Sequence, residues 1–317
     1  MHLATWVEGG EVVSGVVADA ACHRFPDDHS MLEVIAMGLP AALEVGRRAV
    51  DTASSVALAD VRLLPPLTPP SVRDFAAFEK HVEGALLSVT TQGRVPDEWY
   101  QRPAFYFTNP HALIGAHDDV AIPPGCTELD FELEVAVIAT GDARSVTPDR
   151  AAEHIFGYTI MNDWSARDIQ VSEMRVGLGP CKSKDSATTL GPWIVTRDEL
   201  VEHLDDGGFL DLDLRVLVNG VQVGHDRLAA MSWTFPELLA QAAHGTVVRS
   251  GDVLGSGTCG RGGSLAELWG FAGERTPPPL QAGDVVEMIV EGIGSIRNRV
   301  VAGAEPVLIP PARRRGV

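Results

Sequence analysis

The sequence has few cysteines and no long apolar run. Its four cysteines, Cys22, Cys126, Cys181 and Cys259, are far apart and form no CxxC pair. This spacing argues against a disulfide framework or a zinc ribbon and predicts reduced, buried thiols. No stretch of apolar residues is long enough to span a membrane. The first residues, MHLATWVEGGEVV, lack the basic start and apolar core of a secretory signal. We therefore expect a cytoplasmic protein without a membrane partner.

Positive charge is scarce as well. The chain has 25 Lys and Arg residues against 43 Asp and Glu residues, a net charge of −18. Such a negative surface repels phosphate backbones, so we expect no nucleic-acid partner. Lysine occurs at only two places, at Lys80 and at the pair Lys182 and Lys184. A lysine ammonium is more compact than the planar fork of arginine, so both places are candidate sites.

The organisation of the chain indicates one large domain with a small companion. The 317 residues are 45% hydrophobic, an ordinary globular balance. The Pro-rich segment 64–70 predicts a stiff boundary between a small N-terminal domain or arm (1–68) and a main domain (69–317). Strand-like segments outnumber helical ones and only some helices lie between strands, so we expect a β-rich α+β fold. Asn219-Gly220 predicts a hairpin turn, and residues 75–89 have helical character.

Two glutamates alternate with apolar residues in the segment Asp130–Val137. On a strand, Glu132 and Glu134 would share one face, about 7 Å apart. Two carboxylates in this arrangement repel each other unless a cation or an arginine lies between them. Their oxygens suit Mg²⁺, Mn²⁺ or Ca²⁺. The alternative is a strand face exposed to solvent.

Further acidic and basic groups lie at the ends of predicted elements. Asp163 ends an apolar strand, where a carboxylate is well placed to reach a ligand. It could equally cap the next helix or pair with Arg167. Asp74, Lys80 and His81 follow the Pro-rich segment. A histidine that titrates near neutral pH can act as a general base on water.

The glycines of segment 255–260 spell GxGxxG. A dinucleotide cradle needs a helix to begin at the last glycine, but Arg261-Gly262-Gly263 follows here. Glycine at that density opposes an immediate helix, so we expect an ordered loop that approaches a ligand by its backbone. Cys259 is a candidate nucleophile, although no histidine lies near it in sequence.

Together these segments resemble the fumarylacetoacetate hydrolase family over roughly residues 70 to 302. The matching motifs are RDFxxFxxH at 73–81, FELEVAVI at 131–138, MNDWSARDIQ at 161–170, Lys184 followed by TTLGPW at 188–193, SGDVLGSGT at 250–258 and GDVVEMIVEGIGSIRN at 283–298. The ExE strand followed by NDxSARDxQ is specific in combination. The resemblance implies a mixed β-roll with a β-sandwich-like core, usually as a homodimer.

The resemblance also implies roles for particular residues. The metal ligands are Asp74, Glu132, Glu134 and Asp163, the catalytic residues are His81, Glu267 and Lys184, and the substrate contacts are Tyr106, Arg167, Gln170 and Thr258. In this scheme His81 is the general base and Glu267 orients it. Many family members carry a glutamate three residues after the histidine, where this chain has Gly84.

The resemblance therefore predicts a divalent-metal-dependent hydrolase, similar to fumarylacetoacetases and acylpyruvases. Its small-molecule substrate would be a β-diketone or acylpyruvate-type oxo acid that is cleaved at a C–C bond. Carboxylate ligands favour Mg²⁺ over zinc, with Mn²⁺ or Ca²⁺ as alternatives. The same site could serve a decarboxylase, a hydratase or a tautomerase, and a non-catalytic metal-binding relative is a further alternative.

Overall fold

A computed structural model describes residues 1–51, 54–90 and 93–315. Its largest element is a sheet with the strand order β4-β3-β2-β1-β15-β13-β11-β19-β6-β7, in which β5 lies beside β1 and β8 beside β15. The bounds of these strands are β1 (His2–Glu8), β2 (Glu11–Ala18), β3 (Ala21–Arg24), β4 (Val56–Ala57), β5 (Arg62–Leu63), β6 (Val72–Phe75), β7 (Phe105–Thr108), β8 (Leu113–Ile114), β11 (Leu133–Ala139), β13 (Ile155–Asp163), β15 (Thr188–Thr196) and β19 (Val253–Gly255).

A second sheet and two short strand pairs complete the β-structure. The second sheet has the order β17-β16-β20-β21-β9, with bounds β17 (Val221–Arg227), β16 (Asp213–Val218), β20 (Val285–Val290), β21 (Gly294–Val301) and β9 (Val120–Ala121). The short pairs are β10 (Leu129–Asp130) with β14 (Ser165–Ala166), and β12 (Ala143–Arg144) with β18 (Val247–Val248). The predicted hairpin is confirmed, because β16 and β17 are joined by Asn219-Gly220, both with positive φ.

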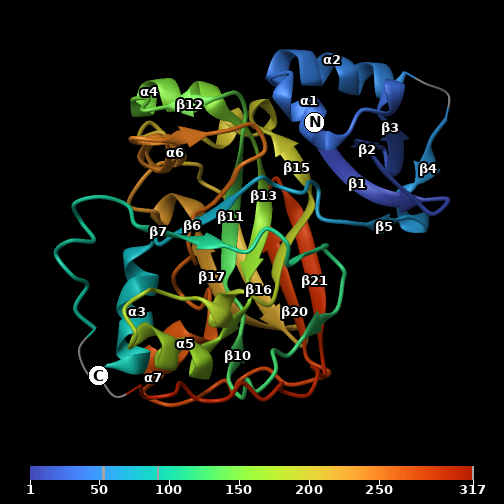
Figure 1. The fold of residues 1–317 in the computed structure, drawn as a ribbon. Coiled ribbons are helices and arrows are strands. Elements are labelled where there is room, and N and C mark those ends of the chain that lie inside the picture. The colour runs from blue at the N-terminus through green and yellow to red at the C-terminus, as the bar shows by residue number, and fades with distance from the viewer. Residues whose placement is uncertain (52–53, 91–92, 316–317) are drawn as a thin grey trace.

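The helices lie around these sheets (Figure 1). The α-helices are α1 (Met31–Ala36), α2 (Leu39–Val50), α3 (Glu79–Val89), α4 (Pro148–Ala151), α5 (Arg167–Met174), α6 (Phe235–Ala243) and α7 (Leu265–Ala272). The 3₁₀ helices are η1 (Pro26–Asp28), η2 (Leu58–Asp60), η3 (Ala152–His154), η4 (Lys182–Lys184), η5 (Arg197–His203) and η6 (Leu228–Ala230). In the described part of the chain, no helix is both long and apolar enough to cross a bilayer.

The central strand β11 is buried on both faces. Val135 and Val137 belong to the main core, which also holds Val216 of β16 in the second sheet. Ala136 and Ile138 belong to a second cluster, shared with α1 and α2. This alternation is the one expected of a strand between two layers, and the mixed, strand-rich architecture confirms the predicted fold class.

The N-terminal segment continues the main sheet. β1 pairs antiparallel with β15, with Leu3 opposite Ile194, and Ile194 packs in the cluster that holds α1 and α2. Figure 1 shows this segment in blue beside the central strands. The division of the chain at residues 68 and 69 into two domains stays a prediction.

Two local expectations were wrong. The helix expected at residues 75–89 begins only at Glu79, because Phe75 is the last residue of β6 and residues 76–78 are in neither a helix nor a strand. All four cysteines are free as expected, but only Cys22 and Cys259 are buried. Cys181 is exposed because it lies in the turn that precedes η4.

Helices α3 and α7 cross in close contact at two glycines. A Cβ atom on Gly270 would lie 1.9 Å from the carbonyl oxygen of Gly84. A Cβ on Gly84 would lie 2.5 Å from Cγ of Glu267. The absence of both side chains therefore lets the two backbones approach, and this approach brings His81 on α3 near Glu267 on α7.

We expect Gly270→Ala to lower the free energy of unfolding by about 2 kcal/mol, because the added methyl group would force the two helices apart. Helix propensity would offset only about 1 kcal/mol of the strain. Ala272→Ser, on an exposed position of the same helix, is the control and should stay within about 0.5 kcal/mol of the parent. Denaturant unfolding measures both, and equal stabilities would contradict the proposed helix contact.

Candidate active site

Three strands bring two carboxylates to opposite sides of Gly255. β19 lies between β6 and β11, so that Gly255 pairs with Asp74 on one side and with Ala136 on the other. A Cβ atom on Gly255 would lie 2.7 Å from Oδ1 of Asp74 and 2.8 Å from Oε2 of Glu134. This glycine therefore leaves the space in which the carboxylates meet. The GxGxxG pattern marked this segment, but the sequence did not reveal this purpose.

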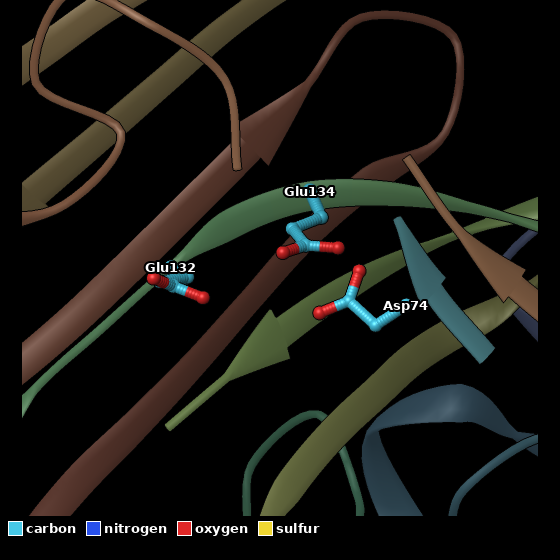
Figure 2. A group of neighbouring side chains, drawn as sticks. All are labelled: Asp74, Glu132 and Glu134. Atoms are coloured by element: carbon cyan, nitrogen blue, oxygen red, sulfur yellow. The ribbon is translucent and has the colours of Figure 1, made fainter. Parts of the chain in front are cut away.

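Asp74, Glu132 and Glu134 converge in that space (Figure 2). Each offers a carboxylate oxygen, and the three oxygens lie within 4.8 Å of one another. All three side chains are buried, so the alternative of a solvent-exposed strand face is wrong. Oδ1 of Asp74 is a buried atom without a hydrogen-bond partner among the described residues. A compact set of oxygen donors with an unsatisfied member fits a hard divalent cation.

The electrostatics of the three carboxylates differ. Burial, and then repulsion from Asp163, raises the pKa of Asp74 well above its usual value. Burial, and then repulsion from Asp74, does the same to the pKa of Glu134. Burial would also raise the pKa of Glu132, but Lys184 and Arg167 outweigh it and hold that pKa below its usual value. A cation bound here would take the place of protons on Asp74 and Glu134.

Arg167 holds Glu132 in place. Its Nη2 donates to Oε1 of Glu132 at 2.6 Å and its Nε donates to Oδ2 of Asp130 at 2.8 Å. Asp130 is fully buried and also accepts the backbone N–H groups of Leu265 and Ala266, at the start of α7. Asp130 thus joins the helix that carries Glu267 to the arginine that fixes Glu132. Sequence reasoning missed this residue, although it directly precedes the glutamate strand.

Asp163 lies beside the three-carboxylate group. Its Oδ2 accepts hydrogen bonds from Nζ of Lys184, at 2.7 Å, and from the hydroxyl of Tyr106. Its Oδ1 is buried without a partner among the described residues. Neither alternative role holds, because α5 has no side-chain cap and Arg167 pairs with Asp130 and Glu132 instead. Its role as a fourth ligand stays a prediction.

Of the three lysines, only Lys184 reaches this site. It is buried, and its Nζ donates to Glu132 as well as to Asp163. The carboxylates raise the pKa of Lys184 against the opposing effect of burial, which is the largest single influence. Lys80 and Lys182 are exposed and pair with Glu83 and Asp185. The interpretation of Lys80 as a site residue was therefore wrong, because its ammonium lies over the ring of Phe271 beside Glu83 and does not line the cavity.

His81 lies between two glutamates. Its Nδ1 is 3.6 Å from Oε2 of Glu267, and its Nε2 is 3.8 Å from Oε1 of Glu132. Both carboxylate oxygens of Glu267 and Nδ1 of His81 are buried and have no hydrogen-bond partner among the described residues, so the imidazole and the carboxylate face each other as an unsatisfied pair. Glu83 points away toward Lys80. The glycine at position 84 leaves room for the Glu267 side chain, which occupies the space a side chain there would need.

The polar groups open into one cavity of about 670 Å³. Asp163 and Glu267 do not line it, but they contact lining residues. The predicted site residues that line it are Asp74, His81, Tyr106, Glu132, Glu134, Arg167, Gln170, Lys184 and Thr258. Gln170 accepts from Nη1 of Arg167 at 2.9 Å, and the hydroxyl of Thr258 is 3.4 Å from Oε1 of Glu134. The structure thus brings together residues from segments far apart in the sequence.

Residues 71–301 match the model of the fumarylacetoacetate hydrolase C-terminal domain. The chain belongs to the fumarylacetoacetate hydrolase family. It is 27% identical over 245 residues to the oxaloacetate tautomerase of Bacillus subtilis (strain 168), an alignment that covers 77% of this chain and 74% of the relative.

Two solved structures of this family fold share 27% identity with the chain. A fumarylacetoacetate hydrolase from Exiguobacterium antarcticum matches with a TM-score of 0.73, over 95% of this chain and 99% of that one. A 5-carboxymethyl-2-hydroxymuconate delta-isomerase from Mycobacterium smegmatis matches with a TM-score of 0.67, over 95% and 100%. The family is enzymatic, and its members include hydrolases, isomerases and tautomerases.

We expect Mg²⁺ to stabilise the protein more strongly as the pH rises. In the ion-free chain the raised pKa values of Asp74 and Glu134 mean that the folded state binds protons more tightly than the unfolded state. Its stability should therefore fall as the pH rises from about 4 toward those raised values. Once Asp74 and Glu134 have lost their protons, bound Mg²⁺ would relieve the repulsion between the carboxylates. The increase in Tm on adding Mg²⁺ should therefore grow as the pH rises from about 4 toward those raised pKa values. Thermal melts of the parent and of Asp74→Asn, which should lose most of the effect, measure it; a shift independent of pH would count against the site.

We expect Asp130→Ala to lower the free energy of unfolding by about 3–5 kcal/mol, because it leaves the buried Arg167 with one carboxylate fewer and removes the acceptor of two backbone N–H groups at the start of α7. Asp168→Ala is a matched control, because Asp168 also accepts a backbone N–H, that of Thr127, but is not fully buried. It should cost about 1 kcal/mol. Denaturant unfolding compares the two, and similar losses would mean that Asp130 has no special role.

Proposed function

We propose that the protein is a Mg²⁺-dependent hydrolase that cleaves a C–C bond in an acylpyruvate-type oxo acid. The observation that carries this proposal is the position of His81, between Glu267 and the carboxylate group, on the wall of the cavity. Hydrolysis needs an activated water molecule, whereas decarboxylation and tautomerisation do not. The homodimeric state and the cytoplasmic location stay predictions from the resemblance and from the sequence.

The activation of water falls to His81. Its Nδ1 faces Glu267, so that Nε2 is the nitrogen left to take a proton from water. Glu267 is fully buried, and an ionised carboxylate there favours the imidazolium that forms when His81 accepts the proton. Glu267 on α7 can thus serve as the carboxylate partner of His81 in a chain that has glycine at position 84.

The bond changes follow from the chemistry of the substrate. The water oxygen adds to the acyl carbonyl, and its proton passes to Nε2 of His81. The C–C bond then breaks and its electron pair remains on the pyruvate fragment. The proton that His81 took from water is returned to that carbon, which completes pyruvate beside the released carboxylic acid and regenerates the neutral imidazole. The ammonium of Lys184 and the amide of Gln170 line the cavity where negative charge develops.

Asp74, Glu132 and Glu134, with Asp163 beside them, are the residues proposed to hold the ion. When bound, Mg²⁺ would supply a Lewis acid that polarises the oxygens of the oxo acid. The preference for Mg²⁺ over zinc rests on an all-carboxylate donor set. Arg167 donates a hydrogen bond to Glu132 and Thr258 donates one to Glu134, and these bonds would hold the two carboxylates in place for an ion.

We expect His81→Gln and Glu267→Gln to lower kcat for acetylpyruvate hydrolysis by about 10²–10⁴-fold, because each removes part of the water-activating pair. KM and the Mg²⁺-dependent increase in Tm should change little, since neither residue belongs to the three-carboxylate group. His225→Gln, which replaces an exposed histidine, is the control and should keep full activity. Turnover is followed as release of pyruvate, with and without a chelator.

Other outcomes would assign another function. Oxaloacetate tautomerisation that survives His81→Gln, with no cleavage of acylpyruvates by the parent, would make the protein a tautomerase like its Bacillus subtilis relative. Mg²⁺-dependent stabilisation without turnover of any enolisable oxo acid would indicate a non-catalytic metal-binding protein. Full hydrolytic activity of His81→Gln would remove His81 from the mechanism.

A further inference from the structure

The outer part of the cavity is lined largely by apolar side chains, in contrast to the end that holds the carboxylates. On α3, the lining residues Val82, Ala85, Leu86 and Val89 follow the spacing of a single helix face. Across the cavity, Val171 and Met174 of α5 lie one turn apart. Figure 1 shows both helices at the end of the molecule where α7 also lies. An apolar channel thus leads outward from the site of chemistry.

This apolar lining is left open by the described residues. Val89 and Met174 are 57% and 51% exposed at its outer end, although both line the cavity. An apolar stripe on a helix is normally covered by the core. Here the apolar stripe of α3 faces the cavity. The group that covers it must therefore be a ligand bound in the cavity.

The cavity is also larger than a small oxo acid requires. At the volume that liquid water takes, about 30 Å³ for each non-hydrogen atom, pyruvate would fill roughly 180 Å³. The cavity measures about 670 Å³. Space for a further chain of several atoms therefore remains on the apolar side.

Charged groups at the outer end do not favour a second carboxylate. Arg275 is 3.2 Å from Glu128 and lies over the ring of Trp269, so it is already paired. Arg175 also lines the cavity, but its side chain is exposed to solvent, where an ion pair with a ligand carboxylate would contribute little. The net charge of −18 disfavours an additional anionic group on the ligand.

We propose that the substrate carries an apolar alkyl or aryl acyl group, which lies between α3 and α5, and that the site selects against a second, distal carboxylate. This inference rests on the proposed function for the position of the oxo-acid end at the carboxylates. It adds the substrate class, because the apolar channel can bury an acyl chain of several carbons. Substrates with longer acyl chains would then bind more tightly, because each methylene group is transferred out of water into the channel.

The test measures the binding of 2-oxo acids, which needs no turnover. Calorimetric titrations with Mg²⁺ present compare pyruvate, 2-oxobutanoate, 2-oxohexanoate and 2-oxooctanoate. Each methylene group should tighten binding up to about fourfold. 2-Oxoadipate has the chain length of 2-oxohexanoate with a second carboxylate, and it should bind at least about tenfold more weakly because its charge enters an apolar channel. A flat series, or tighter binding of 2-oxoadipate, would overturn the proposal.

Two variants locate the effect. Ala85→Leu should fill the channel and flatten the dependence on chain length, with pyruvate binding unchanged. Met174→Ser, at an exposed position where folding is not at risk, should weaken 2-oxooctanoate by about three- to fivefold and leave pyruvate unaffected. Val176→Ser is the matched control, because Val176 is exposed nearby but does not line the cavity. An equal effect of Met174→Ser and Val176→Ser would contradict the assignment of the channel.

The outcomes separate this inference from the proposed function. A chain-length dependence of 2-oxo acid binding without cleavage of any acylpyruvate would refute the hydrolase and keep the apolar channel. Cleavage of acetylpyruvate with no gain in kcat/KM for hexanoylpyruvate, together with a flat binding series, would keep the hydrolase and refute the channel.

Discussion

The organisation of the site depends on the burial of several carboxylates in one small volume. Carboxylates placed so close, away from water, repel one another and strongly favour protonation. The chain offsets part of this cost with Arg167 and Lys184, both of which contact Glu132. Lys184 offsets only a part of the cost at Asp74, and the pKa values of Asp74 and Glu134 stay raised. Such a cluster is stable in ionised form only with a cation, which is why the carboxylates, more than any single motif, define what this site can do.

Contacts of Asp130 connect the carboxylate group with the helix that carries Glu267. Asp130 binds both Arg167 and the first backbone N–H groups of α7, so the element that carries Glu267 and the arginine that fixes Glu132 share one anchor. The close crossing of α3 and α7 then sets the position of His81 relative to both. The proposed metal-binding end and the proposed water-activating end are therefore joined by one network of contacts.

The sequence predicted much of the site because its signals are local. The alternation around Glu132 and Glu134 and the turn at Asn219-Gly220 depend on strand geometry, which neighbouring residues determine. The resemblance named the remaining site residues. Asp130 and the purpose of Gly255 were missed because both depend on contacts with residues more than a hundred positions away. Likewise, Phe75 pairs with Phe105 of β7, and the backbone N–H of Ala77 donates to the carbonyl oxygen of Ser256. These long-range contacts outweighed the helical character of residues 75–78.

The pairing of β1 with β15 has a consequence for the whole molecule. Leu190 and Ile194 of β15 are fully buried, and Ile194 lies opposite Leu3. Without residues 1–68, the part of β15 that pairs with β1 would become a sheet edge with free backbone groups and bare aliphatic side chains, while β8 would still pair with Thr188 and Thr189. Such an edge is a template for pairing with other chains. The N-terminal segment therefore covers a sheet edge that would otherwise be open to pairing with another strand.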